Sequence, residues 1–408
     1  MDFDIVVLGG GLVGSSLACA LDGRGYRTAL VEGTLPRQSP PGFDERKLAL
    51  SAASLNALGA LGVLAQLPEP PSPIRCIHVS RQGDFGVVRL DAGDVGRAAF
   101  GGVVSARGLG QALEKRLAAL ANLEMLRPQT VSGIRDIEGG IALRLQPGFD
   151  AAATDESGAG ELTARLLVAA DGTESFARQA HGIAVDRHDY LQTLLVCSLA
   201  TDRAANGGAY ERFTGDGPVA LLPMGRQYGA ICAVPRVEAD TVMAMEDTAY
   251  MEYFQGRFGW RAGRVVRVGR RSAYPIARVI AERIISRRMV LMGNAAQTIH
   301  PIGAQGFNLG LRDALALAEV LVAAGADADP GSETMLQAYQ QSRREDRERT
   351  LSFSDGLARA TGNASLPMHL LRSIGLMALA NVPGLSAPLV SGAMGFRGNV
   401  PALSRDSA

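Results

Sequence analysis

The 408-residue sequence predicts an α/β protein, α+β in part, in which a mixed β-sheet is inserted into a domain of alternating strands and helices. Three observations support this fold class. Residues 3–32 follow the order strand, glycine-rich turn, helix, strand, and residues 289–321 follow the order strand, turn, helix. Between these units, residues 188–274 contain strand-like runs separated by Gly and Pro turns. A chain of this length has room for two or three domains. Helices are predicted at its C-terminal end.

The composition argues against several classes of protein. The 41 basic and 41 acidic residues cancel, which disfavours a nucleic-acid-binding surface. Lys47 and Lys115 are the only lysines, so Schiff-base chemistry has almost no candidates. The acidic N-terminus lacks the pattern of a signal peptide, and no apolar run approaches the ~20 residues that span a bilayer. We therefore expect a cytoplasmic protein and leave peripheral contact with the inner membrane open.

The four cysteines are scattered and form no CxxC pair. We expect them to be reduced thiols of the core, and we expect no metal site. They are Cys19, Cys76, Cys197 and Cys232.

The first element is a Rossmann-like dinucleotide-binding unit. Gly9, Gly11 and Gly14 fit the pattern G-x-G-x-x-G between a strand at 3–8 and a helix at 12–21. Glu32 ends the second strand, about 20 residues after the motif, where an acid accepts hydrogen bonds from ribose hydroxyls. The glycines let backbone amides touch a pyrophosphate at the start of the helix. A purely structural glycine turn is the alternative, and the motif does not distinguish FAD from NAD.

The next segment leads out of this domain and back. A loop is predicted at 36–43. Arg46 follows it, and its own surroundings in the sequence indicate only a solvated charge. Ser51 is then predicted to cap a helix. Residues 68–73 form a stiff crossing into a hairpin at 74–90, whose His78 has no second metal ligand at a usable spacing. An amphipathic helix from Arg107 to Leu120 returns to the first domain.

Residues 123–274 are predicted to be mainly strands. A small polar loop spans residues 148–160, and a buried strand at 166–170 ends at Asp171-Gly172, which alone indicates only a turn. Residues 188–274, with a helix at 249–258, would form one wall of a substrate cavity.

The glycine-rich stretch from Gly293 to Asp313 joins a buried strand to a helix predicted at 309–321. It has no charged side chain from Asn294 to Leu311. Glycines let a backbone approach a flat ligand, and amides at a helix start supply positive potential. This suits a planar group that can carry negative charge, such as a reduced flavin. An ordinary strand-to-helix connection is the alternative.

The C-terminal part is predicted to be helical. Residues 332–351 form a charged helix whose pairs, such as Glu345 with Arg349, mark a solvated face. Residues 366–379 are apolar, and we interpret them as a core-packing helix, with a membrane-contacting helix as the alternative. We predict a nucleotide-binding domain from residues 1–73, 98–187 and 275–365, a substrate domain from 74–97 and 188–274, and a C-terminal helical segment at 366–408.

Three motifs in this order resemble those of the FAD-dependent aromatic hydroxylases of the p-hydroxybenzoate hydroxylase type. They are the GxGxxG unit with its acid, Asp171-Gly172, and the stretch GNAAQTIHPIGAQGFNLGLRD. That last stretch and RKLALSAASLNALGALGV are most similar to the ubiquinone-biosynthesis branch, in particular its 2-polyprenyl-6-methoxyphenol hydroxylases. The resemblance covers essentially the whole chain. The resemblance implies that the substrate is a polyprenylated phenol. A complex with other ubiquinone-biosynthesis proteins is left open.

The resemblance also implies roles for individual residues. Those implied to bind the cofactor are Gly9, Gly11, Gly14 and Glu32 at the ADP half; Arg46 and Arg107 along it; Asp171 and Gly172, in a motif used for FAD and NADPH; Asn294 at ribityl or ribose hydroxyls; and Pro301, Gly306, Phe307 and Asn308 at the isoalloxazine. The candidates implied for the catalytic centre are His300, Pro301 and Gly306. The order Gly303-Ala304-Gln305 departs from the commoner Ala-Gly-Gln, and Asn294 stands where most relatives have Asp.

The implied chemistry is aromatic hydroxylation. NADPH or NADH would reduce FAD, molecular oxygen would give a C4a-hydroperoxyflavin, and the phenol ring would attack its distal oxygen. The helix start at 308–310 would supply positive potential near the flavin, and no metal is needed. The sequence does not identify a base for the phenol: His300 is nearest by motif, and a structural role for it is the alternative.

Three other functions are compatible with parts of this pattern. A flavin-dependent halogenase needs W-x-W-x-I-P, which is impossible because Trp260 is the only tryptophan. A hydroxylase of a small soluble phenol and a non-catalytic FAD-binding assembly subunit remain as alternatives.

Overall fold

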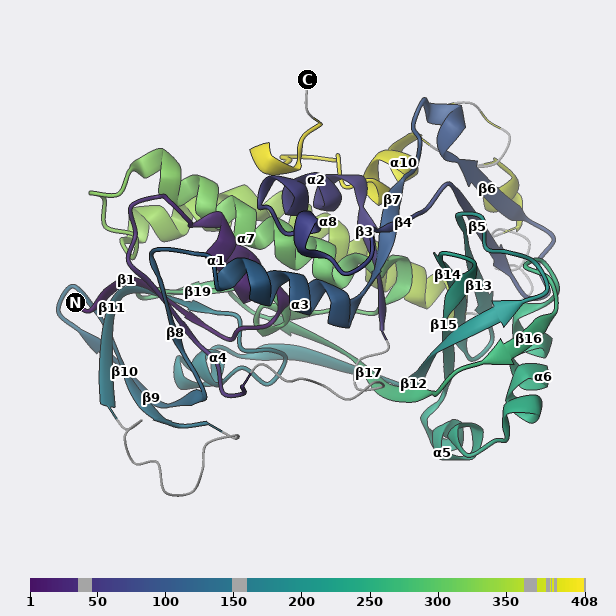
Figure 1. The fold of residues 1–408 in the computed structure, drawn as a ribbon, viewed down its shortest axis with the longest axis horizontal. Coiled ribbons are helices and arrows are strands. Elements are labelled where there is room, and N and C mark those ends of the chain that lie inside the picture. Colours follow the sequence, from purple (N-terminus) through teal and green to yellow (C-terminus); the bar gives the residue numbers. More distant parts are fainter. Residues whose placement is uncertain are drawn as a thin grey trace.

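The computed structural model describes residues 1–35, 46–148, 160–362, 373–378, 382, 384 and 387–406. The predicted loop at 36–43, nearly all of the loop at 148–160 and most of the helix at 366–379 lie outside the described residues. The described chain forms three sheets with helices packed on them (Figure 1).

The first sheet contains the dinucleotide-binding unit. Its strand order is β18-β19-β11-β1-β2-β8, with β10 on β11 and β9 on β10. The run from β19 to β8 is parallel. Its inner strands β19, β11, β1 and β2 are apolar and buried toward their carboxyl ends, as expected for a sheet covered on both faces, whereas β8 at the edge is only partly buried. The strands are β1 Phe3–Leu8, β2 Thr28–Val31, β8 Leu123–Leu126, β9 Gln129–Ile137, β10 Gly140–Pro147, β11 Gly160–Ala169, β18 Ile285–Ser286 and β19 Met289–Leu291.

Helices cover this sheet. In Figure 1, α1 lies between α3 and α7 above the strands, and α8 packs against α7. The short α4 follows the end of β11. These helices are α1 Leu12–Ala20, α3 Ala106–Leu117, α4 Phe176–Ala180, α7 Gln305–Ala324 and α8 Glu333–Gly362.

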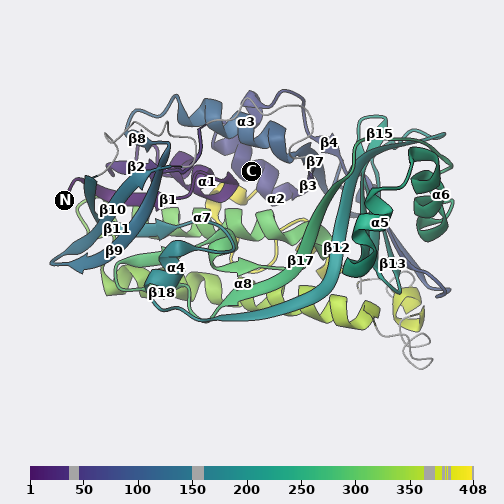
Figure 2. The ribbon, with the colours of Figure 1, turned by 90° about the horizontal axis from the view of Figure 1, so that it is seen from below.

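The second sheet has nine strands in the order β20-β17-β12-β15-β14-β13-β5-β6, with β16 also on β12. The long strands β12 and β17 pair with each other and, in Figure 2, run from beside α4 and β18 up toward β15, so they join the two halves of the molecule. The strands are β5 Cys76–Arg81, β6 Val87–Asp91, β12 Val185–Thr201, β13 Gly208–Thr214, β14 Gly217–Met224, β15 Gln227–Pro235, β16 Val265–Val268, β17 Ser272–Ala281 and β20 Gln297–Thr298.

The two faces of the second sheet pack against different partners. Helix α6 (Asp247–Phe258) covers the outer face, where Leu221 and Tyr228 join a core with Phe254. The inner face carries Ala209 and Leu222, which pack with residues of the third sheet and of α10 (Ala387–Ala393). The short α5 is Ala239–Met243, and the third sheet consists of β3 Lys47–Ser51, β7 Gly101–Ser105 and β4 Ser72–Pro73.

Many local predictions are confirmed. The predicted hairpin at 74–90 is the antiparallel pair β5–β6, and the predicted helix at 249–258 is α6. Ser51 caps α2 (Ala52–Ala60), because its hydroxyl accepts a hydrogen bond from Ser54 N at 3.2 Å. Three of the four cysteines are buried and Cys76 is half-buried. The domain boundaries stay a prediction.

The solvated-face interpretation of the charged helix is right for one side only. The predicted pair of Glu345 with Arg349 is exposed on α8. Arg343 on the same helix is fully buried, and its Nε donates to Asp313 Oδ1 of α7 at 2.7 Å. Its Nη2 donates to Asp346 Oδ2, also at 2.7 Å. Charge alone does not show which side of such a helix faces a neighbour, because a buried charge needs a partner from another element.

The C-terminal part is described in pieces. Residues 373–378 are helical, with Ser373 buried and Ile374 and Met377 exposed. A 3₁₀ turn follows at Ala402–Ser404. Within the described ranges, no helix combines the length and hydropathy needed to cross a membrane.

Candidate functional site

The three glycines of the first motif have different structural roles. A Cβ on Gly14 would lie 2.1 Å from Gly9 O, so Gly14 lets α1 pack on its own loop. A Cβ on Gly9, whose φ is +104°, would lie 2.5 Å from Ala170 O at the end of β11. A Cβ on Gly11 would meet no atom of the described residues within 4 Å. Gly11 therefore borders open space at the start of α1, where the first-turn amides lack helical partners.

Glu32 closes the far side of this loop. Its Oε2 accepts from Gly10 N at 2.8 Å, and its Oε1 accepts from the backbone N–H and the hydroxyl of Thr34 at 3.0 and 2.8 Å. Because each carboxylate oxygen can accept more than one hydrogen bond, ribose hydroxyls still have sites on it. The acid is thus held in place beside the glycine loop.

The second motif lies beside the first. Asp171 follows β11, and its Oδ2 accepts from Ala177 N at 3.1 Å, at the start of α4. Burial raises the pKa of this carboxyl, against the lowering effect of the hydrogen bonds from Ser175 and Ala177. Its Oδ1 is buried and has no hydrogen-bond partner among the described residues. A buried acceptor without a partner is costly, so this atom suits a donor from a ligand.

Arg178, which sequence reasoning did not single out, ties the second motif to the third. Its buried guanidinium donates to Ala295 O at 2.9 Å and to Thr173 O at 2.8 Å. The hydroxyls of Thr173 and Thr298 are 2.8 Å apart. The two motifs, about 120 residues apart in sequence, are held together by these contacts.

The third motif also packs on the first. A Cβ on Gly310 would lie 2.7 Å from Val13 Cγ2, and one on Gly293 would lie 3.1 Å from the same atom. Val13 of α1 therefore fits against two glycines of the third motif. Asn294, between them in sequence, is exposed. All three motifs meet at one end of the parallel strands, where α/β sheets bind their ligands.

The loop before α7 has an unusual backbone. Gly303 and Ala304 both have left-handed conformations, with φ of +68° and +51°. Alanine carries a steric cost there, so the inverted order Gly-Ala places a strained residue at the N-cap of α7. The helix begins at Gln305 and not at 308–309 as predicted, so the first-turn amides are those of 305–307. Gly306 is exposed, and a Cβ on it would meet nothing described within 4 Å.

His300 is in a structural position. It is buried, its Nδ1 is 3.3 Å from Ile302 N, and its ring packs edge-on to Tyr190 with centroids 4.7 Å apart. Burial lowers the pKa of His300 to about 4. A base of that pKa is poorly matched to a proton transfer near neutral pH. These contacts favour the structural alternative for His300.

The two predicted arginines are brought together. Arg46 O accepts from Ala106 N at 3.0 Å, which places Arg46 beside Arg107 at the start of α3. The guanidinium of Arg46 is exposed and lies 5.4 Å from the ring centroid of Tyr274 on β17. A Cβ on Gly110 would be 4.0 Å from Leu12, so α3 begins next to α1.

A cavity of about 390 Å³ lies between the start of α3 and the second sheet. Lys47 and Arg107 line it with Glu69, Gln111 and Ser198. Its volume is in the range of ligand pockets, and the two cationic side chains outnumber the one acidic side chain, so the cavity suits an anionic or electron-rich group.

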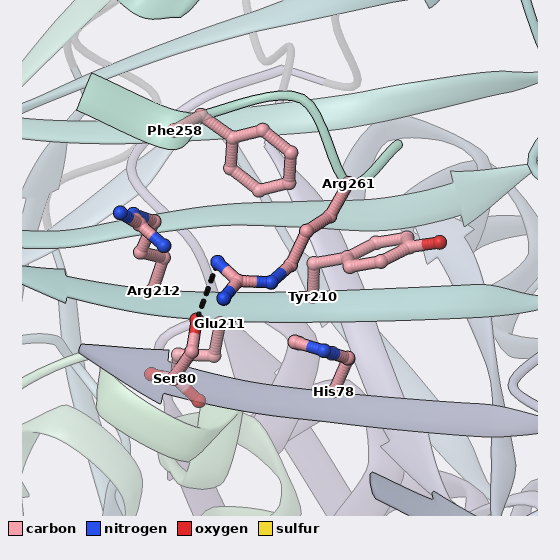
Figure 3. A pocket seen from close by; sticks show the side chains of 7 residues that line it. All are labelled: His78, Ser80, Tyr210, Glu211, Arg212, Phe258 and Arg261. Carbon is pink, nitrogen blue, oxygen red and sulfur yellow. Dashed lines mark hydrogen bonds between the residues drawn. The ribbon is translucent and has the colours of Figure 1, made fainter. Parts of the chain in front are cut away.

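A second crevice, formed by Tyr210, Arg212, Phe258 and Arg261 with their neighbours, is too small to hold a water molecule. Figure 3 shows Arg261 reaching Ser80, with a separation of 3.5 Å. We interpret it as packing of the outer face. Among the described residues, no three His, Cys, Asp or Glu side chains form a potential metal site.

The residues present fit FAD. The open face of Gly11, the unpartnered Asp171 Oδ1 and the open face of Gly306 lie on segments that meet at one end of the first sheet. The first turn of α1 has no acidic side chain to oppose a pyrophosphate. The roles of the individual site residues stay predictions.

Comparisons with known proteins support this fit. A family model described as FAD binding domain matches residues 2–354. The ubiquinone hydroxylase UbiL of Rhodospirillum rubrum is 32% identical over 395 residues, covering 96% of this chain and 89% of that protein. The 3-demethoxyubiquinol 3-hydroxylase of Escherichia coli is 29% identical over 407 residues, covering 96% and 98%.

The solved structures agree on the fold. The p-nitrophenol 4-monooxygenase PnpA of Pseudomonas putida superposes with a TM-score of 0.77 at 18% identity, covering 97% of this chain and 99% of that one. The predicted fold class and the predicted family are thereby confirmed. With the matched model spanning most of its length, this chain belongs to the FAD binding domain family.

Proposed function

We propose that the protein is an FAD-dependent, NAD(P)H-using monooxygenase that hydroxylates the aromatic ring of a polyprenylated phenol in ubiquinone biosynthesis. The observation that carries the proposal is the meeting of three motifs around open glycine faces at the end of a parallel sheet. The names of the Rhodospirillum and Escherichia relatives, which match nearly the whole chain, support the substrate class.

The chain's own residues would hold the cofactor along a defined course. Glu32 would accept from ribose, and the first turn of α1 beside Gly11 would face the pyrophosphate. Arg107, at the adjoining start of α3, would supply positive charge to the part of the cofactor between the pyrophosphate and the isoalloxazine. The isoalloxazine would lie at Gly306, whose missing side chain leaves room for a flat ring. When bound, FAD supplies two-electron transfer from the nicotinamide nucleotide and activation of molecular oxygen.

The chain would also shape the chemistry. The first-turn amides of α7, a helix of 20 residues, direct positive potential toward the loop that contains Gly306. Such fixed dipoles stabilise negative charge that develops on a bound group. The inner face of the second sheet, with Ala209, Ala220 and Leu222, offers an apolar wall that excludes water from a phenol ring.

A substrate with a polyprenyl tail partitions into lipid. The proposal therefore includes peripheral contact with the inner membrane, which flotation with vesicles would test. A complex with other ubiquinone-biosynthesis proteins is a further part of it, testable by co-purification.

One experiment separates the candidate functions. The purified protein should be yellow, should release FAD on denaturation, and should oxidise NADPH faster when a prenylated phenol is added, with a hydroxylated product. FAD binding without phenol-stimulated NADPH oxidation would instead indicate a non-catalytic subunit. Equal turnover of prenylated and unprenylated phenols would favour a small soluble substrate.

A further inference from the structure

Glu211 is an acidic side chain on the inner face of the second sheet. It lies on β13, opposite Val79 of β5 and Ala220 of β14. Because side chains alternate along a strand, Glu211 and its neighbour Arg212 point to opposite faces. Both residues border the outer crevice, but in Figure 3 Arg212 lies across from Arg261, whereas the carboxylate of Glu211 points away from both arginines. Glu211 therefore shares the apolar inner face with small and aliphatic residues.

The inner face at this point meets the third motif. The backbone N–H of Gly303, in the loop that leads to Gly306, lowers the pKa of Glu211, which places this loop beside the carboxylate. The side chain is only partly accessible to solvent. It is thus placed between the wall proposed for the phenol and the loop proposed for the isoalloxazine. Val79 and Ala220 beside it offer no hydrogen-bonding side chain.

The surroundings of Glu211 bring the pKa of its carboxyl close to neutral pH. Burial raises the pKa of Glu211 to about 7, against the lowering effect of the Gly303 amide. On β5, Arg81 is paired with Asp84 at 3.4 Å. Helix α8, which also packs on β13, carries the half-buried Asp355. His300 lies ahead of the loop and is neutral near pH 7, because burial lowers its pKa to about 4.

We propose that Glu211 accepts the hydroxyl proton of the phenolic substrate. The inference rests on the proposed function and names a base that the motif residues do not supply. In the step, the phenol O–H bond breaks, a carboxyl O–H bond forms, and no electrons are exchanged. The phenolate charge spreads into the ring and raises the nucleophilicity of the carbon to be hydroxylated. The proton later leaves to water, because the side chain is partly accessible.

The test uses Glu211→Gln, which keeps the size of the side chain and an oxygen for the Gly303 N–H. Arg212→Gln is the matched control, one residue along the strand on the opposite face. A methoxyphenol with one isoprene unit would be titrated into each FAD-loaded protein at a series of pH values, and its dissociation constant would be measured from the change in flavin absorbance. This measurement needs no turnover. A carboxylate accepts a hydrogen bond from the phenol O–H only when it is ionised, so we expect the affinity of the wild type and of the control to fall as the pH drops below about 7, and the affinity of Glu211→Gln to vary little over that range.

Turnover provides the second measurement. General-base catalysis contributes about 10²–10⁴-fold, so we expect Glu211→Gln to lose at least about a hundredfold in kcat near neutral pH and to recover as the pH approaches 10. A Glu211→Gln protein whose affinity for the phenol falls below pH 7 as that of the wild type does overturns the inference, whether or not the phenol is hydroxylated. A wild type whose affinity depends on Glu211 in this way but which forms no hydroxylated product rejects the proposed function alone.

Discussion

Asn308 Oδ1 accepts a hydrogen bond from Ser51 N at 3.0 Å, which fastens the first turn of α7 to the start of α2. The same oxygen accepts from the Ser54 hydroxyl at 2.7 Å. Its Nδ2 donates to Ala49 O at 2.9 Å and to Ala304 O at 2.8 Å. The buried amide therefore uses its hydrogen-bonding capacity within the protein and holds the loop beside β3.

Replacing Asn308 by Ala should destabilise the fold more than it changes any direct contact with the cofactor. Unpaired buried groups cost about 1–3 kcal/mol each, so we expect a loss of at least about 2 kcal/mol in the free energy of unfolding. Urea unfolding of the FAD-free protein would measure it. Gln305→Ala, which removes an exposed amide on the same turn, is the control and should change stability little. A stable Asn308→Ala protein would show that these hydrogen bonds do not hold the loop.

Gly11 and Gly14 should respond differently to the same substitution. A methyl group on Gly14 meets Gly9 O at 2.1 Å, so Gly14→Ala should lower Tm even without FAD. Gly11→Ala meets no described atom within 4 Å, and its φ of −67° suits alanine. We expect a normal Tm and a strongly reduced ratio of flavin to protein absorbance. Full flavin content in Gly11→Ala would exclude this face as the pyrophosphate site.

Gly306→Leu should abolish hydroxylation and leave the protein folded. The new side chain enters space that no described residue fills and that we assign to the isoalloxazine. Circular dichroism and steady-state product formation would check both halves of the prediction. Gly256→Leu on α6 is a matched control, because a Cβ there also meets no described atom within 4 Å. Normal turnover in Gly306→Leu would mean that another loop faces the flavin.

Asp346 should contribute stability that is lost in acid. Burial raises the pKa of this carboxyl, but Arg312 and Arg343 outweigh it and hold the pKa below its usual value. A group with a lowered folded pKa stabilises above its unfolded value of about 3.9, and the contribution is lost as the pH falls through the folded pKa.

We therefore expect the Tm of the wild type to fall below about pH 4. Asp346→Asn should start from a lower Tm and lose less over the same pH range. Glu345→Gln, an exposed neighbour on the same helix, should follow the wild-type curve. Parallel curves for Asp346→Asn and the wild type would contradict the prediction.

An apolar tail on the phenol should strengthen binding and coupling. Burial contributes about 0.8 kcal/mol per CH₂, so one five-carbon isoprene unit could add on the order of 3 kcal/mol, about a hundredfold in affinity before ordering costs. The uncharged stretch at 376–395, predicted to approach a lipid-facing entrance, lies partly outside the described residues. Kinetics with zero to three isoprene units, with peroxide detection, would measure the effect. Equal kcat/KM and equal coupling across the series would reject the polyprenyl substrate.

The sequence alone determined the local units and the family. The glycine spacing and Glu32 lie within about 30 residues, so a strand, a tight turn and a helix can be predicted from neighbouring residues only. The inverted order Gly303-Ala304 was visible as a departure from the family pattern. Its consequence, an alanine with a φ of +51°, needed the backbone.

Contacts between distant segments were decided by the tertiary structure. Arg343 stands in a run of charged residues, and only the packing of α8 on α7 buries it against Asp313. Glu211 and Gly303 are far apart in sequence, and the alternation of β13 shows two faces without showing which one meets the third motif. That choice follows from packing, because α6 covers one face of the second sheet while residues of the third sheet and of α10 pack on the other. Periodicity reports the faces of one element, whereas burial depends on which element covers each face.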